Sequence, residues 1–158
     1  MTSASLTSLY TDIIFEHDKR PLHAGLREPF EGEVHHVNPT CGDEITLRLH
    51  LTGPVDDPVI EDVSYDAQGC AMSRASASMM ADLLRGQSVE RAAEISDSFE
   101  LSMASRGKDA GDEELIGDAV ALLGASKFPG RVKCVVMPWK AYRAALVESL
   151  AALGAAEA

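Results

Sequence analysis

The stretch EITLRLHL, residues 44–51, alternates without a break between polar and apolar side chains. Its apolar positions are Ile45, Leu47, Leu49 and Leu51. A period of two predicts a β-strand with one buried face and one polar face. Residues 32–37 and 59–68 flank it as further strand candidates. Because parallel neighbours need a long crossover, the short turns between these segments favour a three-stranded antiparallel sheet.

Helical patterns lie on both sides of the predicted sheet. A first helix is predicted over residues 3–16, and apolar residues recur at the helical period in residues 70–84, 88–105 and 115–123. After a Pro-Gly break we expect a helical segment over 131–137 and a separate last helix over 139–153, with Pro138 in its first turn. Strands followed by helices predict an α+β fold, with the helices on one face of a small antiparallel sheet.

Length and charge exclude several classes of function. The chain has 158 residues, the size of one domain, so we treat residues 1–158 as a single domain. Its 14 Lys and Arg against 25 Asp and Glu give a net charge of −11, which disfavours nucleic-acid and membrane-surface binding. No apolar stretch predicts a membrane span, and the N-terminus does not resemble a signal peptide. An odd number of cysteines, three, agrees with a reducing compartment, so we expect a cytoplasmic protein.

The first two cysteines lie where predicted elements meet. Cys41 and Asp43 flank Gly42 in a turn, and glycine permits backbone conformations that would let both side chains point to one centre. Cys70 follows the third strand at the predicted start of a helix, where backbone N–H groups favour a thiolate.

Cys134 is the third cysteine, and two nearby cations, Arg131 and Lys133, also favour its thiolate. Three thiolates and one carboxylate make a complete tetrahedral set for zinc, and the same set could hold an iron–sulfur cluster. Buried cysteines that only fill the core remain an alternative on spacing alone, because no CxxC pair is present. The histidines are weaker ligand candidates: His17 and His23 are expected in a surface loop.

Three sequence motifs resemble those of a known family. Residues 38–43 (NPTCGD), 69–73 (GCAMS) and 127–134 (KFPGRVKC) are similar, in this order, to the cysteine motifs of the SufU/IscU/NifU N-terminal family of iron–sulfur cluster assembly proteins. The resemblance implies an IscU/SufU-like fold. It also implies that the metal ligands are Cys41, Asp43, Cys70 and Cys134.

Departures from the IscU branch of that family indicate the SufU branch. IscU proteins carry a histidine where this chain has Lys133, and a Leu-Pro-Pro-Val-Lys motif where residues 127–131 read KFPGR. They also lack the extra segment near residues 107–126. The resemblance implies a zinc-dependent sulfur acceptor that takes persulfide sulfur from a SufS-type cysteine desulfurase and serves downstream Suf assembly proteins.

Within that reading, Cys41 is the expected sulfur acceptor, because it lies on the flexible turn, and Arg131 and Lys133 are candidates to assist by steadying the anion. Three alternatives stay open. They are an IscU-type scaffold that assembles a transient iron–sulfur cluster on the same ligands, a purely structural zinc domain, and a redox-active thiol enzyme, for which the usual CxxC pair is missing.

Overall fold

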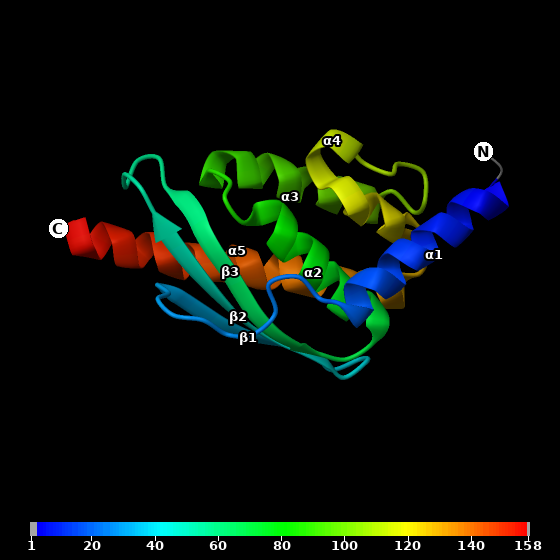
Figure 1. Cartoon of the computed structure of the whole chain (residues 1–158), viewed down its shortest axis with the longest axis horizontal. Helices are drawn as coiled ribbons and strands as arrows, with labels where there is room; N and C mark the ends of the chain where they lie inside the picture. Colours follow the sequence, from blue (N-terminus) through cyan, green and yellow to red (C-terminus); the bar gives the residue numbers. More distant parts are fainter. Residues whose placement is uncertain (1–2, 158) are drawn as a thin grey trace.

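The computed structural model describes residues 3–157, and the side chains of residues 8–155. Three strands, β1 (Gly32–Asn38), β2 (Asp43–Thr52) and β3 (Val59–Gln68), form an antiparallel sheet in the order β1-β2-β3. The helices are α1 (Ser3–Lys19), α2 (Ala71–Leu84), α3 (Val89–Ala104), α4 (Glu113–Ile116), the 3-10 helix η1 (Gly117–Lys127) and α5 (Pro129–Glu157). Figure 1 shows the helices gathered on one side of the sheet. The predicted α+β fold is confirmed.

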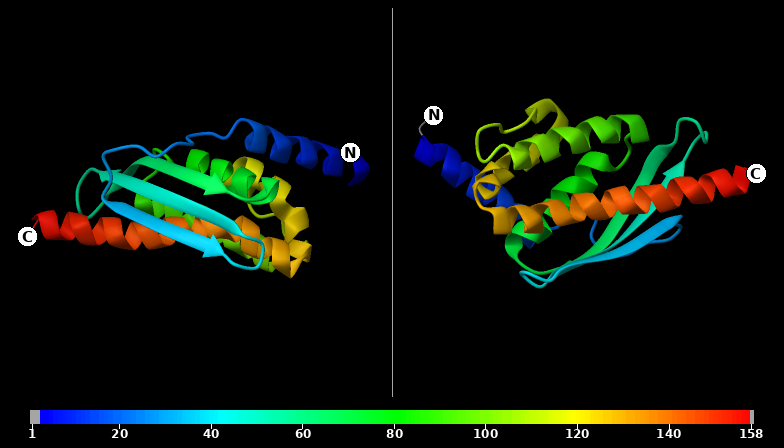
Figure 2. Two further views of the ribbon diagram at one scale, coloured as in Figure 1. Left: turned by 90° about the horizontal axis from the view of Figure 1, so that it is seen from below. Right: turned by 180° about the vertical axis from the view of Figure 1, so that it is seen from behind.

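Strand β2 is the centre of the sheet and of the core. Leu47 pairs with Val34 on one side and Tyr65 on the other, and the apolar residues of β2 are almost fully buried. Alternation within residues 44–51 therefore identified the inner face correctly. Against this face pack α2 and α5, and both views of Figure 2 show α5 running along the sheet. Further from the sheet, the rings of Phe99 and Trp139 stack with centroids 4.2 Å apart.

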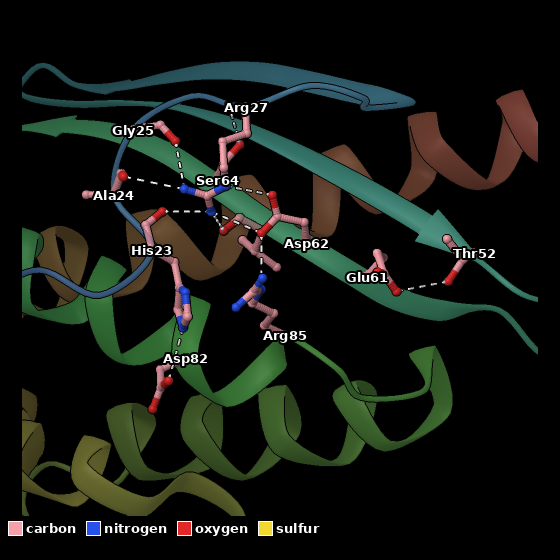
Figure 3. A network of polar contacts seen from close by, with 11 residues as sticks. His23, Ala24, Gly25, Arg27, Thr52, Glu61, Asp62, Ser64, Asp82 and Arg85 are labelled. Atoms are coloured by element: carbon pink, nitrogen blue, oxygen red, sulfur yellow. Dashed lines mark hydrogen bonds and ion pairs between the residues drawn. The ribbon is translucent and has the colours of Figure 1, made fainter.

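The segment between α1 and β1 covers the free edge of β3. Ala24 forms a parallel bridge with Tyr65, and the N–H of Gly25 donates a 2.8 Å hydrogen bond to the Tyr65 carbonyl. Arg27 secures this segment (Figure 3), because its Nε and Nη2 donate to the two carboxylate oxygens of Asp62 at 2.8 and 3.0 Å. Asp62 also pairs with Arg85, at 3.3 Å.

The prediction of two helices meeting at Pro138 is wrong. One helix, α5, runs from Pro129 to Glu157 with Pro138 inside it. Proline cannot donate to the carbonyl four residues earlier, which is that of Cys134. The helix continues because burial outweighs this loss: Trp139 and Ala141, just beyond the proline, are fully buried.

Two further expectations are corrected. The segment predicted as one helix over 115–123 is the short α4 followed by the 3-10 helix η1, because Gly117 has a φ of +48° and ends the α-helical geometry.

His17 does not lie in a surface loop, since α1 extends to Lys19 and the ring is buried. Its Nδ1 lies 2.7 Å from Ser78 Oγ and its Nε2 2.8 Å from Asp118 Oδ2, partners remote in sequence. No helix in the described part of the chain is long and apolar enough to cross a membrane.

Candidate metal centre

Three segments remote in sequence meet at one end of the sheet. They are the β1–β2 turn, the start of α2 and the first turns of α5, which Figure 1 shows at the same end of the molecule. One potential ligand atom from each of Cys41, Asp43 and Cys134 lies within 4.8 Å of the others. The Sγ atoms of Cys41 and Cys134 are 2.8 Å apart, and Cys41 Sγ is 2.8 Å from Asp43 Oδ2. These three predicted residues therefore come together.

Cys70, the fourth predicted residue, borders this group. Its Sγ lies 3.7 Å from Asp43 Oδ2, and its backbone forms the N-cap of α2. The Cys70 backbone N–H donates a 2.9 Å hydrogen bond to Asp43 Oδ1. Asp43 thus accepts from the Cys70 backbone with Oδ1 and faces the thiols of Cys41 and Cys70 with Oδ2.

Asp43 is a buried carboxyl, with only 1% of its surface exposed. Burial acts to raise its pKa, but hydrogen bonds from the thiols of Cys41, Cys134 and Cys70 and from the Cys70 backbone outweigh burial, so the pKa is lowered from its ordinary value. The site therefore holds a carboxylate, the form that a cation requires.

Gly69 makes the close approach of Asp43 possible. A Cβ atom at residue 69 would lie 2.0 Å from Asp43 Oδ1, and the φ of Gly69 is +141°. Both the contact and the backbone conformation select glycine. The Gly-Cys pair at the β3–α2 junction is thus a geometric requirement of the site.

The third cysteine is buried. Cys134 is the sixth residue of α5, and only 5% of its surface is exposed. Burial and the hydrogen bonds with Cys41 and Asp43 raise the pKa of the Cys134 thiol, so the nearby cations do not by themselves produce a thiolate. Cys41 and Cys70 are exposed.

Asn38 is a residue of the site to which sequence reasoning gave no role. Its amide Nδ2 donates to Cys41 Sγ at 3.1 Å and lies 3.8 Å from Cys134 Sγ. As the last residue of β1 it pairs with Asp43, the first residue of β2. A buried amide beside two sulfurs is the kind of outer contact that orients metal ligands. Its position inside the first cysteine motif was the available signal.

Arg131 and Lys133 lie on two different sides of Cys134. Arg131 lines a mostly apolar cavity of about 410 Å³ that reaches Ala71, the neighbour of Cys70, and its guanidinium carbon is 5.3 Å from the centre of the Phe128 ring. Lys133 lines a separate groove of about 440 Å³ beside Asn38. Both side chains are exposed.

The donor set suits a thiophilic cation. The compact group holds two sulfurs and one carboxylate oxygen, and the neighbouring Cys70 would bring it to the number and type of ligands of a closed tetrahedral zinc site. No histidine joins the group among the described residues. The Sγ atoms of Cys41 and Cys134 are 2.8 Å apart, which is less than the separation of two sulfurs that each lie about 2.3 Å from a tetrahedral zinc ion. The two thiols would therefore have to move apart to admit a cation.

Known proteins resemble this chain over most of its length. The family described as the NifU-like N-terminal domain matches residues 9–135. A Bacillus subtilis protein named zinc-dependent sulfurtransferase SufU is 39% identical over 140 residues, 88% of this chain and 90% of the relative. A Streptococcus pyogenes protein named iron–sulfur cluster assembly scaffold protein IscU is 38% identical over 149 residues, 94% of this chain and 89% of the relative.

Solved structures share the fold. A protein from Fervidobacterium islandicum AW-1, described as a candidate iron–sulfur cluster assembly scaffold for the SUF system, superposes with a TM-score of 0.76 at 29% identity, covering 92% of this chain and 99% of that one. An N-terminal NifU-like protein from Brucella abortus superposes with a TM-score of 0.78 at 16% identity, over 89% of this chain and 93% of the other, which supports the fold alone. The resemblance drawn from the three cysteine motifs is thus confirmed, and the chain belongs to the NifU-like N-terminal domain family.

Proposed function

We propose that this protein is a zinc-containing sulfur acceptor in cytoplasmic iron–sulfur cluster assembly, and that it takes persulfide sulfur from a SufS-type cysteine desulfurase for downstream Suf assembly proteins. One observation carries the proposal: an exposed thiol, that of Cys41, lies in contact with a buried carboxylate and a second thiol. A carrier needs both a ligand set and one reachable sulfur. The name of the Bacillus subtilis relative supports the same activity.

Four residues would hold the metal: Cys41, Asp43, Cys70 and Cys134. A zinc ion there would keep the cysteines as thiolates without itself changing oxidation state. The need for such help is visible in the chain, because the pKa of the Cys134 thiol is raised by burial. The carboxylate of Asp43, which contacts the Cys41 thiol, would complete the set of four ligands with an oxygen.

Cys41 is the proposed acceptor because its loop leaves it reachable. It lies in the β1–β2 turn next to Gly42, which has a φ of +73°. A Cβ atom added at Gly42 would have no neighbouring atom within 4 Å, so the space around this part of the turn is open. By contrast, Cys70 is tied to Asp43 through its backbone, and Cys134 is held inside α5. In the transfer, the Cys41 thiolate attacks the outer sulfur of the donor persulfide. A new S–S bond forms at Cys41, the donor S–S bond breaks, and the electron pair leaves with the donor cysteine as its thiolate.

Arg131 and Lys133 are proposed to assist by steadying anionic sulfur as the donor approaches. Each is an exposed cation within three residues of Cys134, and their cavities reach Asn38 and Ala71, which adjoin the cysteines of the site. A guanidinium and an ammonium lower the free energy of an approaching persulfide anion, and water partly screens both.

The proposal is tested by adding the protein to a SufS-type cysteine desulfurase that is turning over cysteine. We expect faster alanine formation and one zinc per chain in the same preparation. A protein that binds zinc but leaves the desulfurase rate unchanged would instead be a structural zinc module, and the proposal would be abandoned.

A second candidate function rests on the Streptococcus pyogenes relative, which is named a scaffold. The same four residues would then assemble a transient iron–sulfur cluster. Anaerobic purification separates the two functions, because a scaffold would contain iron and acid-labile sulfide, whereas the proposed carrier contains zinc.

A further inference from the structure

The two edges of the sheet differ in whether another segment pairs with them. At the β3 edge, Ala24 bridges to Tyr65 and Ser88 bridges to Val59, so neighbouring segments occupy much of it. At the β1 edge, no described residue forms a bridge with the strand. An unpaired edge offers a row of backbone donors and acceptors to another chain.

The orientation of the free backbone groups on β1 follows from two hydrogen bonds. The carbonyl of Asn38 accepts from Gly42 and so points towards β2, whereas the N–H of Glu33 points outwards and donates to Glu148 Oε2 at 3.2 Å. Because these directions alternate along an antiparallel strand, the N–H groups of His35 and Val37 also point outwards. Glu148 caps one end of the edge, and the end nearest the thiols stays open.

A basic groove lies beside this open end. The groove has a volume of about 440 Å³ and is formed by β1, the following turn and α5. It is lined by His35, His36, Val37, Asn38, Pro39, Lys133, Met137 and Lys140. The two lysines are seven residues apart, two helical turns, and therefore project from the same side of α5.

No described lysine is in an ion pair with a carboxylate, and Lys133 and Lys140 are the two lysines that line this groove. Seven arginines are engaged in ion pairs, namely Arg20, Arg27, Arg48, Arg74, Arg85, Arg91 and Arg143. Lys133 and Lys140 are exposed and form no ion pair with any described carboxylate. Among the described residues, the ion pair formed by the groove lining is that of His35 with Glu44, at 3.4 Å. Positive charge next to a free strand edge is complementary to an acidic, extended chain.

We propose that the β1 edge and the groove between β1 and α5 bind an extended acidic segment of a partner protein as a fourth strand of the sheet. The segment hydrogen-bonds to the outward backbone groups of His35 and Val37. Its alternate acidic side chains point towards Lys133 and Lys140. This is strand addition, in which backbone pairing supplies affinity and alternate side chains supply selectivity. The inference does not depend on the proposed sulfur transfer.

The test uses a fluorescein-labelled peptide of alternating Glu and Thr, added to the full-length protein. We expect saturable binding by fluorescence anisotropy and slower hydrogen exchange at the amides of His35 and Val37. A peptide with the same residues grouped as a Glu block and a Thr block carries equal charge in the wrong pattern, and should bind at least about tenfold more weakly.

Two substitutions separate strand addition from general charge attraction. Lys140→Glu should weaken binding of the alternating peptide at least about tenfold, whereas Lys108→Glu, the same change in an exposed loop away from the groove, should alter it by less than about twofold. Val37→Pro removes one outward N–H at an exposed edge position and should also abolish binding. If Val37→Pro misfolds by circular dichroism, exchange at His35 and the Lys140→Glu result still decide.

Three results would overturn the proposal. They are absence of binding up to about 1 mM peptide, equal weakening by Lys108→Glu and Lys140→Glu, and binding without slower exchange at His35 and Val37. None of these readouts involves zinc or the desulfurase, so their failure is distinguishable from failure of the proposed function.

Discussion

Asp43 Oδ1 accepts a 2.9 Å hydrogen bond from the backbone N–H of Cys70, and this contact joins the first residue of β2 to the N-cap of α2. The other oxygen of the same carboxylate lies 2.8 Å from Cys41 Sγ. One side chain therefore sets the position of a helix start and also borders the thiol cluster.

Gly69→Ala should damage the fold and the metal site together. The new Cβ would overlap Asp43 Oδ1, and the positive φ of residue 69 adds backbone strain. We expect a loss of about 1–3 kcal/mol in the free energy of unfolding, with reduced zinc content. Urea denaturation and elemental analysis provide the two readouts. Gly154→Ala is the matched control, since that glycine lies in α5 with open space around it; a similar loss in both variants would contradict the explanation.

Asn38→Ala should weaken metal binding without removing a ligand. The amide of Asn38 donates to Cys41 Sγ and lies near Cys134 Sγ, so its loss frees two thiols to reorient. Outer contacts of this kind are worth about 10–100-fold in metal affinity. Competition with a chromogenic zinc chelator measures the change. The substitution also removes the acceptor for the Thr40 N–H. Thr40→Pro, which removes that donor together with the Thr40 hydroxyl but keeps the Asn38 amide, is therefore the control and should have the smaller effect.

Removal of the metal should lower thermal stability while leaving the fold intact at room temperature. The four proposed ligands come from three segments, so a bound cation cross-links the β1–β2 turn, α2 and α5. The core built on β2 does not depend on it. We expect the melting temperature to fall on the order of 10 °C after chelation. An unchanged melting curve after verified removal of zinc would show that the site does not stabilise the fold.

Asp62 should contribute an acid-dependent part of the stability. Hydrogen bonding from Arg27 is the main cause that lowers the pKa of Asp62 in the folded chain (Figure 3). A lowered folded pKa gives stabilisation that is complete above the unfolded value of about 4 and is lost as the pH falls through the folded pKa. Asp62→Asn should therefore cost about 1–2 kcal/mol at pH 7, because the pair is partly exposed.

As the pH falls from about 4 through the folded pKa of Asp62, the Asp62→Asn variant should lose less stability than the wild type. Denaturation curves across this range provide the comparison. Glu61→Gln changes an exposed carboxylate on the same strand and should leave the acid dependence as it is. Identical acid profiles for Asp62→Asn and the wild type would refute the role of the pair.

Local pattern was sufficient to predict the sheet. The alternation in residues 44–51 identified the buried face of β2, because strand periodicity is a property of the strand itself. The meeting of Cys41, Asp43 and Cys134 was predicted through the resemblance of the three cysteine motifs, because spacing alone left a shared site open. Single-sequence reasoning did not reveal the contacts of Asn38, whose partner sulfur in Cys134 is 96 residues away.

Packing between residues remote in sequence determines two features that the local pattern did not predict, the continuity of α5 and the burial of His17. Proline at 138 is locally a break, yet burial of Trp139 and Ala141 keeps α5 continuous. His17 reads as a surface residue because its partners, Ser78 and Asp118, lie 61 and 101 residues further along the chain. In both positions tertiary burial overrides a local preference.

The identity of the sulfur acceptor is the central claim, and persulfide detection by mass spectrometry tests it most directly. Wild type and the Cys41→Ala, Cys70→Ala and Cys134→Ala variants are incubated with a cysteine desulfurase and cysteine, and zinc is measured in each. We predict that the wild type gains one sulfur atom on Cys41. Cys41→Ala should accept none while keeping much of its zinc, whereas the other two variants should lose zinc and stability together. Persulfide that persists in Cys41→Ala and disappears only in Cys134→Ala would contradict the account and assign the acceptor role to the buried cysteine.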